Sequence, residues 1–255
     1  MCIRDSIKFI RIDTNPKVEI PALSNFISST ERGTTLEKDG EFIKTTEHIL
    51  AALYAAGITN CEIQTNGPEI PIMDGSSKFF VEAILRVGIV EQTEYQDLFV
   101  VEEVIHHTDT KTGSEILLLP SENTCFSVMI DFKTKVLGSQ NANLMTLEDF
   151  PNEIAPARTF CFLHELEDLI DNGLIKGGDL NNAIVYVNEP IAKTKIERLK
   201  KIFRKDEISI KPNGILDNLK LNFPNEAARH KLLDLIGDLA LVGMQIQGLI
   251  FYTIP

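Results

Sequence analysis

Three polar side chains on a leucine-rich segment, RHKLLDLIGDLALVG, have the types and spacing of a metal or catalytic site. His230, Asp234 and Asp238 follow one another at intervals of four residues. At about 100° per residue this spacing places them along one stripe of a helix, while apolar side chains cover most of the remaining surface. A helix that is apolar nearly all round is normally buried. Buried carboxylates need an ion-pair, hydrogen-bond or metal partner. We therefore expect the aspartates of this stripe to have such a partner.

Two readings of this stripe are open. The aspartates could simply pair with the neighbouring cations Arg229 and Lys231, which is a structural explanation. A second site favours chemistry: Glu47 and His48 lie in the first turn of an alanine- and leucine-rich helix that we predict over residues 43–57, with Thr45 or Thr46 as its N-cap. The positive end of a helix dipole disfavours imidazolium there, so His48 is biased toward the neutral form that binds metals.

Together the two segments offer three candidate ligands for a catalytic zinc site. His48, His230 and Asp234 are two nitrogen donors and one oxygen donor, which matches a zinc ion with an open fourth position rather than a closed, cysteine-rich structural site. The spacing of His230 and Asp234 puts two ligands on one helix face. Glu47 is adjacent to a ligand, where a general base for a zinc-activated water would lie.

Composition limits the classes of partner. The chain has 255 residues, 44% hydrophobic and 24% charged, with a net charge of −12 and a pI near 4.9. This acidity argues against a nucleic-acid partner and against electrostatic docking to anionic lipid. The four cysteines are scattered, which indicates reduced thiols. No signal peptide is visible, and no apolar run approaches the roughly 18 residues of a membrane span. We therefore expect a cytoplasmic protein without a transmembrane segment.

The elements that must position these residues come as strands followed by helices, twice along the chain. In the first half we expect strands in IKFIRI, KVEI and CEIQT, and helices over 43–57 and 78–88. In the second half we expect strands in LFVVEEVIHH, SEILLLP, CFSVMIDF and AIVYV, and helices in LHELEDLIDNG, in the exposed amphipathic IERLKKIFRK and in RHKLLDLIGDLALVG. This order predicts an α+β fold of two halves, with domains at 1–93 and 97–255.

Three blocks of the sequence resemble the zinc-dependent UDP-3-O-acyl-N-acetylglucosamine deacetylases of lipid A biosynthesis: TTEHILAALYAAGITNCEIQTNGPEIPIMDGSSKFFVEAI, IAPARTFCFLHELEDLIDNGLIKGGDLNNAIVYV and RHKLLDLIGDLALVG. The resemblance implies two similar α+β domains of layered sheet and helices, packed as a sandwich with the metal site between them. It implies Zn²⁺ as the cofactor. The implied reaction is hydrolysis of the N-acetyl group of UDP-3-O-(3-hydroxyacyl)-N-acetylglucosamine to the free amine and acetate.

The resemblance also assigns roles to individual positions. It makes His48, His230 and Asp234 the zinc ligands and Glu47 the general base. The other implied roles are oxyanion stabilisation by Thr159, a catalytic or supporting carboxylate at Asp238, aromatic substrate contacts at Phe160 and Phe162, a contact of Lys231 with the polar part of the substrate, and a substrate-binding carboxylate at Asp74. The segment from Gly177-Gly178 to Val185 corresponds to the insert that lines the family's acyl-chain passage.

Each of these positions has a plainer interpretation. Thr159 could cap a helix, and Asp74-Gly75 is a normal turn signal. Phe160 and Phe162 would ordinarily be core residues, and Lys231 would ordinarily be solvated. The remaining histidines, His106, His107 and His164, match no family motif and are interpreted as surface or structural residues.

The sequence departs from the family pattern at both ends. The family opens with a β-hairpin that carries Leu-His-Thr-Gly, and its leaving-group acid is a histidine in a Gly-His motif after the last helix. Here MCIRDS resembles nothing in the family, and no histidine follows His230. We therefore expect a fragment that lacks the N-terminal hairpin and the C-terminal strand region. The Lys/Arg-rich stretch 193–211 resembles the form fused to a 3-hydroxyacyl-carrier-protein dehydratase.

Three hypotheses follow for the function. The first is the zinc deacetylase. The second is a catalytically impaired or inactive fragment that still binds zinc or a UDP-sugar. The third is a zinc amidohydrolase for a different acyl-sugar. The Arg-Thr-Phe and Gly-Gly-Asp-Leu blocks favour the first, because they fit an acyl-UDP-sugar site and generic hydrolysis does not need them.

Overall fold

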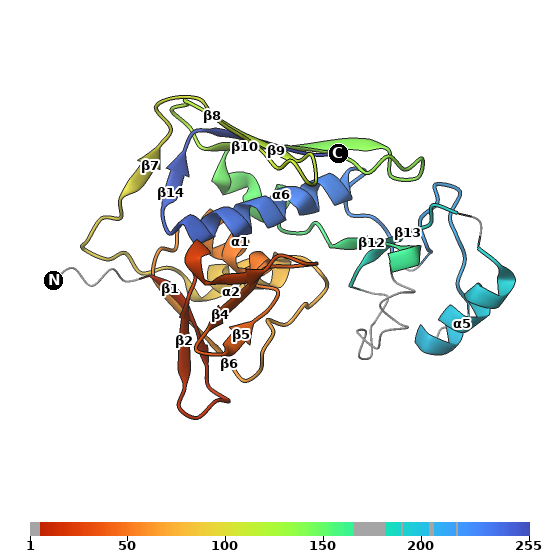
Figure 1. The fold of residues 1–255 in the computed structure, drawn as a ribbon, viewed down its shortest axis with the longest axis horizontal. Coiled ribbons are helices and arrows are strands. Elements are labelled where there is room, and N and C mark those ends of the chain that lie inside the picture. The colour runs from red at the N-terminus through yellow and green to blue at the C-terminus, as the bar shows by residue number, and fades with distance from the viewer. Residues whose placement is uncertain (1–5, 166–181, 190, 204–206, 218) are drawn as a thin grey trace.

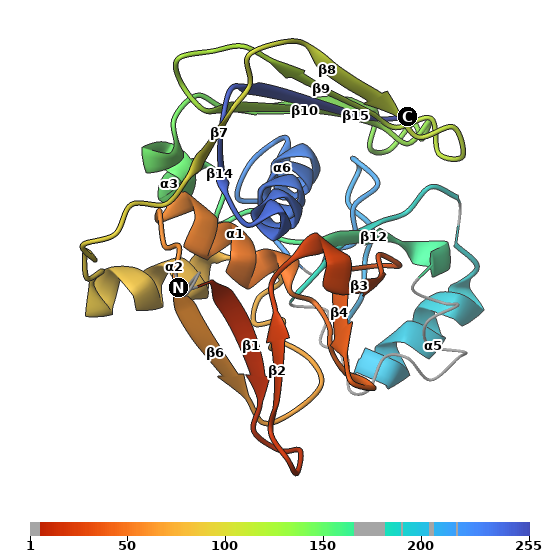
Figure 2. The same ribbon diagram turned by 60° about the vertical axis from the view of Figure 1, so that its left-hand side comes forward.

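Two helices pack against each other in the middle of a layered fold. They are α1 (Glu47–Ala55) and α6 (Glu226–Leu239). A computed structural model describes residues 6–165, 182–189, 191–203, 207–217 and 219–255. A five-stranded sheet covers α6, and smaller sheets lie on the far side of α1 (Figures 1 and 2). The α+β class predicted from the sequence is confirmed, while the division into domains at residues 93 and 97 stays a prediction.

The five-stranded sheet has the order β11-β10-β15-β9-β8. Its strands are β8 (Ile105–Thr108), β9 (Glu115–Leu119), β10 (Cys125–Asp131), β11 (Ser139–Leu144) and β15 (Leu249–Ile254). The central strand β15 runs parallel to β10 and antiparallel to β9. Phe126, Val128 and Ile130 alternate along β10 and are buried, as expected for one face of a strand. This sheet packs on α6 through β10 and β11.

Two three-stranded sheets lie beyond α1. In one, β1 (Ile7–Arg11) pairs antiparallel with β2 (Val18–Pro21) and parallel with β6 (Cys61–Thr65). In the other, β3 (Ile27–Ser29), β4 (Thr35–Lys38) and β5 (Glu41–Ile43) form an antiparallel meander. The meander leads into α1, and the loop that precedes β4 lies against the start of that helix, where Thr34 contacts Thr46 and Glu47. Helix α2 (Lys78–Val87) packs beside α1.

The remaining elements connect these layers. They are β7 (Leu98–Val100) paired with β14 (Gln245–Gln247), β12 (Phe160–Phe162) paired with β13 (Ile184–Tyr186), helices α3 (Phe150–Glu153) and α5 (Lys193–Phe203), and the short 3₁₀ turns η1 (Ser24–Phe26), η2 (Leu147–Asp149) and η3 (Ala240–Val242). Among the described residues, no helix has both the length and the apolar character needed to cross a membrane.

Several predicted elements need correction. The helix predicted over 43–57 begins only at Glu47, because residues 41–43 pair with β4 and Thr45 has a left-handed φ of 58°. The single strand predicted in LFVVEEVIHH is two strands in different sheets, since the exposed Glu102-Glu103 lies between β7 and β8. The helix predicted in LHELEDLIDNG lies mostly outside the described residues. The strands β3, β4, β5, β11, β12, β14 and β15 were not predicted.

Gly237 lets α1 and α6 approach closely. A Cβ atom at this position would lie 2.1 Å from the carbonyl oxygen of Glu47. Backbone cannot yield to such an overlap as a flexible side chain can, so only glycine permits this contact. The close approach brings the first turn of α1 against the face of α6 that carries His230 and Asp234.

We predict that Gly237→Ala lowers the free energy of unfolding by about 1–3 kcal/mol in urea titrations, because the two helices must separate. The matched control is Gly67→Ala, since a Cβ at Gly67 meets no atom within 4 Å. On helix propensity alone, Gly237→Ala would stabilise the protein by up to about 1 kcal/mol. A stabilised variant would therefore show that the close contact has been misjudged.

Candidate metal centre

Helices α1 and α6 bring His48, His230 and Asp234 together. One ligand atom from each residue lies within 4.8 Å of the others. The Oδ1 atom of Asp234 is 3.4 Å from His230 Nε2 and 3.8 Å from His48 Nε2. The two imidazole rings meet edge to face, with their centroids 5.0 Å apart. The structure thus joins the two sites that the sequence suggested separately, 182 residues apart at His48 and His230 (230 minus 48).

The donor atoms of this cluster fit a cation. Asp234 Oδ1 and His48 Nδ1 are buried and have no hydrogen-bond partner among the residues that the structure describes. Buried polar atoms normally find a partner, yet Oδ1 faces two ring nitrogens without bonding to either. Two imidazole nitrogens and one carboxylate oxygen are a usual donor set for a catalytic zinc ion. An ion among these three side chains would satisfy Oδ1.

Both histidines are held in the neutral form that can coordinate a metal. Burial lowers the pKa of His48 to about 4, and the neighbouring His230 and Lys231 add to the shift. Burial likewise lowers the pKa of His230. His230 Nδ1 lies 3.1 Å from the carbonyl oxygen of Ala157. A carbonyl oxygen can only accept, so Nδ1 carries the hydrogen and the lone pair of Nε2 points toward Asp234.

Asp234 uses its two oxygens differently. Lys231 Nζ donates to Oδ2 at 2.9 Å, while Oδ1 faces the histidines. Burial alone would raise the pKa of Asp234, but His230, Lys231 and His48 outweigh it and lower the pKa to about 2. Pairing with a neighbouring cation, the structural explanation of the polar stripe, therefore provides a partner for Asp234 Oδ2 but none for Oδ1. Arg229, the other candidate partner, instead pairs with Glu153 at 2.6 Å.

Glu47 is buried beside the cluster and is held by the loop that precedes β4. The N–H of Thr34 donates to Glu47 Oε2 at 3.0 Å. A Cβ on Gly33 would lie 2.9 Å from Oε1, so glycine leaves room for this carboxyl group. Burial, reinforced by Asp234, raises the pKa of Glu47 to about 8. A bound cation would oppose this shift by favouring the carboxylate.

Thr34 is a residue of the site that sequence reasoning missed. Its hydroxyl donates to Asp238 Oδ1 at 2.6 Å while its N–H holds Glu47, so one buried threonine fixes two carboxyl groups. Its carbonyl oxygen accepts from the hydroxyl of Thr46, the N-cap residue of α1. Burial raises the pKa of Asp238 to about 6, against the opposing effect of the Thr34 hydrogen bond. No spacing signal could find a contact across 204 residues.

The raised pKa of Glu47 predicts how a Glu47→Gln variant behaves without metal. The folded-state pKa of about 8 exceeds the ordinary 4.5, so the folded protein binds more protons between these values and loses stability as the pH rises through them. With the metal removed by a chelator, we expect the free energy of unfolding of Glu47→Gln to exceed that of the wild type by about 1–3 kcal/mol at pH 9. At pH 5 we expect little difference between the two proteins. An exposed control, Glu37→Gln, should show no such pH-dependent gain. Equal effects of Glu47→Gln at both pH values would contradict the buried, protonated carboxyl.

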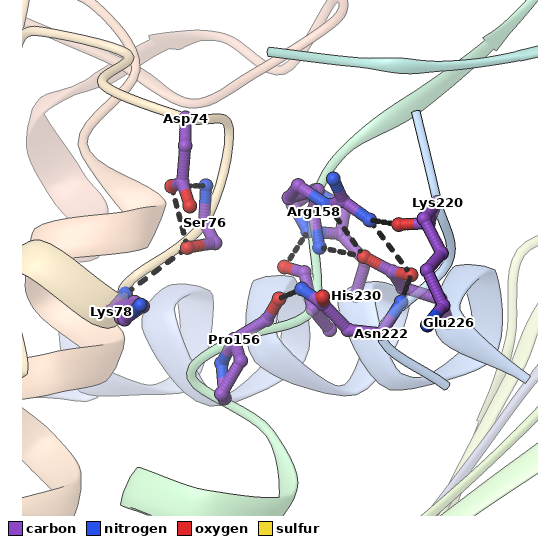
Figure 3. Close-up of polar contacts among 10 residues, drawn as sticks. Asp74, Ser76, Lys78, Pro156, Arg158, Lys220, Asn222, Glu226 and His230 are labelled. Carbon is purple, nitrogen blue, oxygen red and sulfur yellow. Dashed lines mark hydrogen bonds and ion pairs between the residues drawn. The ribbon is translucent and has the colours of Figure 1, made fainter. Parts of the chain in front are cut away.

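Thr159 and Asp74 lie in adjoining segments. Thr159 directly precedes β12 and begins no helix; its N–H donates to Gly75 O at 2.7 Å and its carbonyl accepts from Ile184 N at 2.8 Å. A Cβ on Gly75 would lie 3.0 Å from Thr159 Cγ2. Asp74 Oδ1 accepts from the N–H and hydroxyl of Ser76 (Figure 3). These contacts of Asp74 are those of a turn before α2.

The aromatic positions form a cluster next to Lys231. Phe160 and Phe162 contact each other and also Phe132 and Tyr186, with ring centroids 5.7–6.4 Å apart. Lys231 Nζ lies 5.8 Å from the centroid of Phe160, so this lysine connects the aromatic cluster to Asp234 and is only partly exposed.

Other predicted positions lie away from the cluster or cannot be placed. The Gly177-Gly178 part of the expected acyl-chain insert lies outside the described residues, whereas Ile184–Tyr186 forms β13. His106 and His107 are exposed on β8, and His164 stacks on Phe162. These three histidines have the surface and packing positions expected of them.

The chain matches one family model and several named relatives. The model, described as "LpxC: UDP-3-O-acyl N-acetylglycosamine deacetylase", matches residues 3–204 and 198–253. A Chlorobaculum tepidum protein named "Bifunctional enzyme LpxC/FabZ" is 44% identical over 250 residues, which cover 97% of this chain and 54% of the relative. A Bacteroides thetaiotaomicron protein of the same name is 42% identical over 248 residues, with the same coverages of 97% and 54%. A Myxococcus xanthus protein named "UDP-3-O-acyl-N-acetylglucosamine deacetylase" is 38% identical over 244 residues, 95% of this chain and 69% of the relative. The chain thus spans about half the length of the two bifunctional relatives.

Proposed function

Because the chain belongs to the UDP-3-O-acyl-N-acetylglycosamine deacetylase family, we propose that it catalyses zinc-dependent removal of the acetyl group from UDP-3-O-(3-hydroxyacyl)-N-acetylglucosamine, a step of lipid A biosynthesis. The observation that carries the proposal is the convergence of His48, His230 and Asp234 beside the buried Glu47. Each of these residues comes from a segment that resembles the family.

We propose His48, His230 and Asp234 as the zinc ligands. The open oxygen of Asp234 and the neutral imidazoles support this assignment. A divalent cation held there would act as a Lewis acid toward the amide carbonyl and the attacking water. Lys231 holds the second oxygen of Asp234 and so fixes the direction of the first.

We propose Glu47 as the general base. Its carboxyl group is buried beside Asp234, and the Thr34 N–H occupies one oxygen, which leaves the other to accept a proton from the attacking water. Asp238 and Glu47 both accept hydrogen bonds from Thr34, and this supports a role for Asp238 in fixing the position of Thr34 and, through it, of the Glu47 carboxyl group. The amine that leaves requires a proton, and acetate is the second product.

The substrate contacts remain proposals at the same positions. Thr159 would stabilise the oxyanion, and its placement by hydrogen bonds to Gly75 and Ile184 supports a fixed geometry there. Phe160 and Phe162 would contact the acyl-bearing part of the substrate, and Lys231 the polar part. For Asp74 to contact the substrate, its Oδ1 atom would have to give up the hydrogen bonds that it accepts from Ser76.

Acetate release from UDP-3-O-acyl-N-acetylglucosamine tests the proposal. We expect release that a chelator abolishes and zinc restores, with much slower release from UDP-N-acetylglucosamine, which lacks the acyl chain. Equal rates on both substrates would favour an amidohydrolase for another acyl-sugar. Metal and UDP-sugar binding without any acetate release would favour a protein that only binds.

Two broader assignments also remain proposals. We propose that the whole protein includes a fused 3-hydroxyacyl-carrier-protein dehydratase, which is supported by relatives named "Bifunctional enzyme LpxC/FabZ". The cytoplasmic location expected from the sequence likewise stays a prediction.

A further inference from the structure

One peptide group, between Ala157 and Arg158, is held at both ends by side chains of α6. Its carbonyl oxygen accepts from His230 Nδ1 at 3.1 Å. Its N–H donates to Glu226 Oε1, also at 3.1 Å. Glu226 and His230 are four residues apart, so they share one face of the helix. Figure 3 shows Arg158, Glu226 and His230 gathered over α6.

Glu226 is a fully buried carboxylate whose two oxygens are both occupied. Besides the Arg158 N–H, Oε1 accepts from Arg158 Nε at 2.8 Å. The other oxygen, Oε2, accepts from the Asn222 N–H at 2.6 Å and from Arg158 Nη2 at 3.3 Å. Arg158 Nη2 also donates to the carbonyl of Lys220 at 2.6 Å. The exposed fractions of Glu226 and Arg158 are 0% and 7%.

A buried ion pair of this kind adds little net stability over well-packed apolar residues. Its hydrogen bonds do fix where the connected groups lie. Here the bonds of Glu226, one turn of α6 before His230, fix the orientation of the 157–158 peptide, which itself contacts His230 and directly precedes Thr159. The arrangement therefore indicates that Glu226 helps to position groups of the neighbouring metal centre, in addition to any effect on stability.

We propose that Glu226 is a positioning residue of the metal centre, acting through the Ala157–Arg158 peptide on His230. The carboxylate orients and polarises the peptide, which makes the Ala157 carbonyl a stronger acceptor. That carbonyl keeps the hydrogen of His230 on Nδ1, leaves Nε2 free and increases its strength as a ligand. This inference rests on the proposed function, because it assumes that Nε2 of His230 binds a metal.

Two variants separate the peptide contact from the ion pair. Glu226→Gln removes the carboxylate. Arg158→Lys keeps the charge and the backbone N–H bond to Glu226 but loses the bonds made by the guanidinium. The control for loss of an ion pair to the same helix is Glu153→Gln, which removes the ion pair with Arg229 of α6 and leaves the 157–158 peptide untouched. Arg229 keeps its bonds to the Glu153 carbonyl and to Asn225.

The first readout is the affinity of the metal-free protein for Co²⁺, and the second is the tautomer of His230 in ¹⁵N-histidine NMR spectra without metal. We expect Glu226→Gln to weaken Co²⁺ binding about tenfold or more and to populate the tautomer with hydrogen on Nε2. We expect Arg158→Lys and Glu153→Gln to change the affinity less than about threefold and to keep the wild-type tautomer. Circular dichroism establishes that each variant is folded at the temperature used.

The proposal is overturned if folded Glu226→Gln keeps both the affinity and the tautomer of the wild type. It is also overturned if Arg158→Lys loses as much affinity as Glu226→Gln, since the ion pair would then carry the effect. If Glu226→Gln does not fold, Glu226→Asp replaces it in the same comparison with the wild type. The shorter side chain keeps the charge but moves the carboxylate away from the Arg158 N–H. Wild-type protein that binds no Co²⁺ would instead overturn the proposed metal site, while the tautomer comparison would still test Glu226.

Discussion

Replacing Glu47 by alanine is expected to lower the rate of acetate release about 10²–10⁴-fold, the usual contribution of a general base. The reason lies in its position: the carboxyl group is buried beside Asp234 and is fixed by the Thr34 N–H. Asp238 also bonds to Thr34, through the threonine hydroxyl, but it lies four residues from the proposed ligand Asp234, whereas Glu47 directly precedes His48. The change should appear in kcat, because Glu47 acts on the water rather than on substrate binding.

Zinc content is the control for this prediction. Glu47→Ala should retain bound zinc, because Glu47 is not among the three proposed ligands. The exposed variant Glu37→Ala should keep the wild-type rate. Wild-type turnover by Glu47→Ala with zinc in place would remove the general base from the proposal, and loss of zinc would instead make Glu47 part of the metal site.

Replacing His230 by alanine should remove the metal and lower acetate release on the order of 10³-fold, since Lewis acid assistance contributes several kcal/mol to the barrier. His230 is fully buried, its Nδ1 is bonded to Ala157, and its Nε2 faces Asp234. Among the residues that the structure describes, the candidate metal-ligand group contains His48, His230 and Asp234, and no third histidine belongs to it that could replace His230. Elemental analysis after dialysis would measure the zinc retained.

An exposed histidine supplies the matched control. His106→Ala on β8 removes an imidazole far from α1 and α6 in sequence and should leave both zinc content and turnover unchanged. Full zinc occupancy in His230→Ala would contradict the assigned ligand set.

The candidate site was largely predictable because its signals are local. The four-residue interval between His230 and Asp234 and the apolar surroundings on the same segment indicated a buried polar stripe. Glu47-His48 at the start of an apolar helix indicated a second contributor. The structure adds that α1 and α6 touch at Gly237, which no periodicity could show because the contact joins backbone to backbone.

The less predictable parts depend on contacts distant in sequence. Thr34 bonds to Glu47 and Asp238, and Glu226 bonds to the peptide of Ala157, yet threonine and glutamate in such segments normally suggest a loop and a solvated helix start. Strand β15 is central because it inserts between β10 and β9, and its partners lie more than a hundred residues earlier. Such pairings are set by tertiary packing rather than by local propensity.

Metal titration of chelated protein tests the central claim most directly. Acetate release and bound zinc are measured together as zinc is added to the metal-free chain. We predict no turnover without metal, and a rise that reaches its maximum at about one zinc per chain, as expected for a site with a single set of three ligands. Unchanged turnover by protein shown to contain no metal would contradict the account.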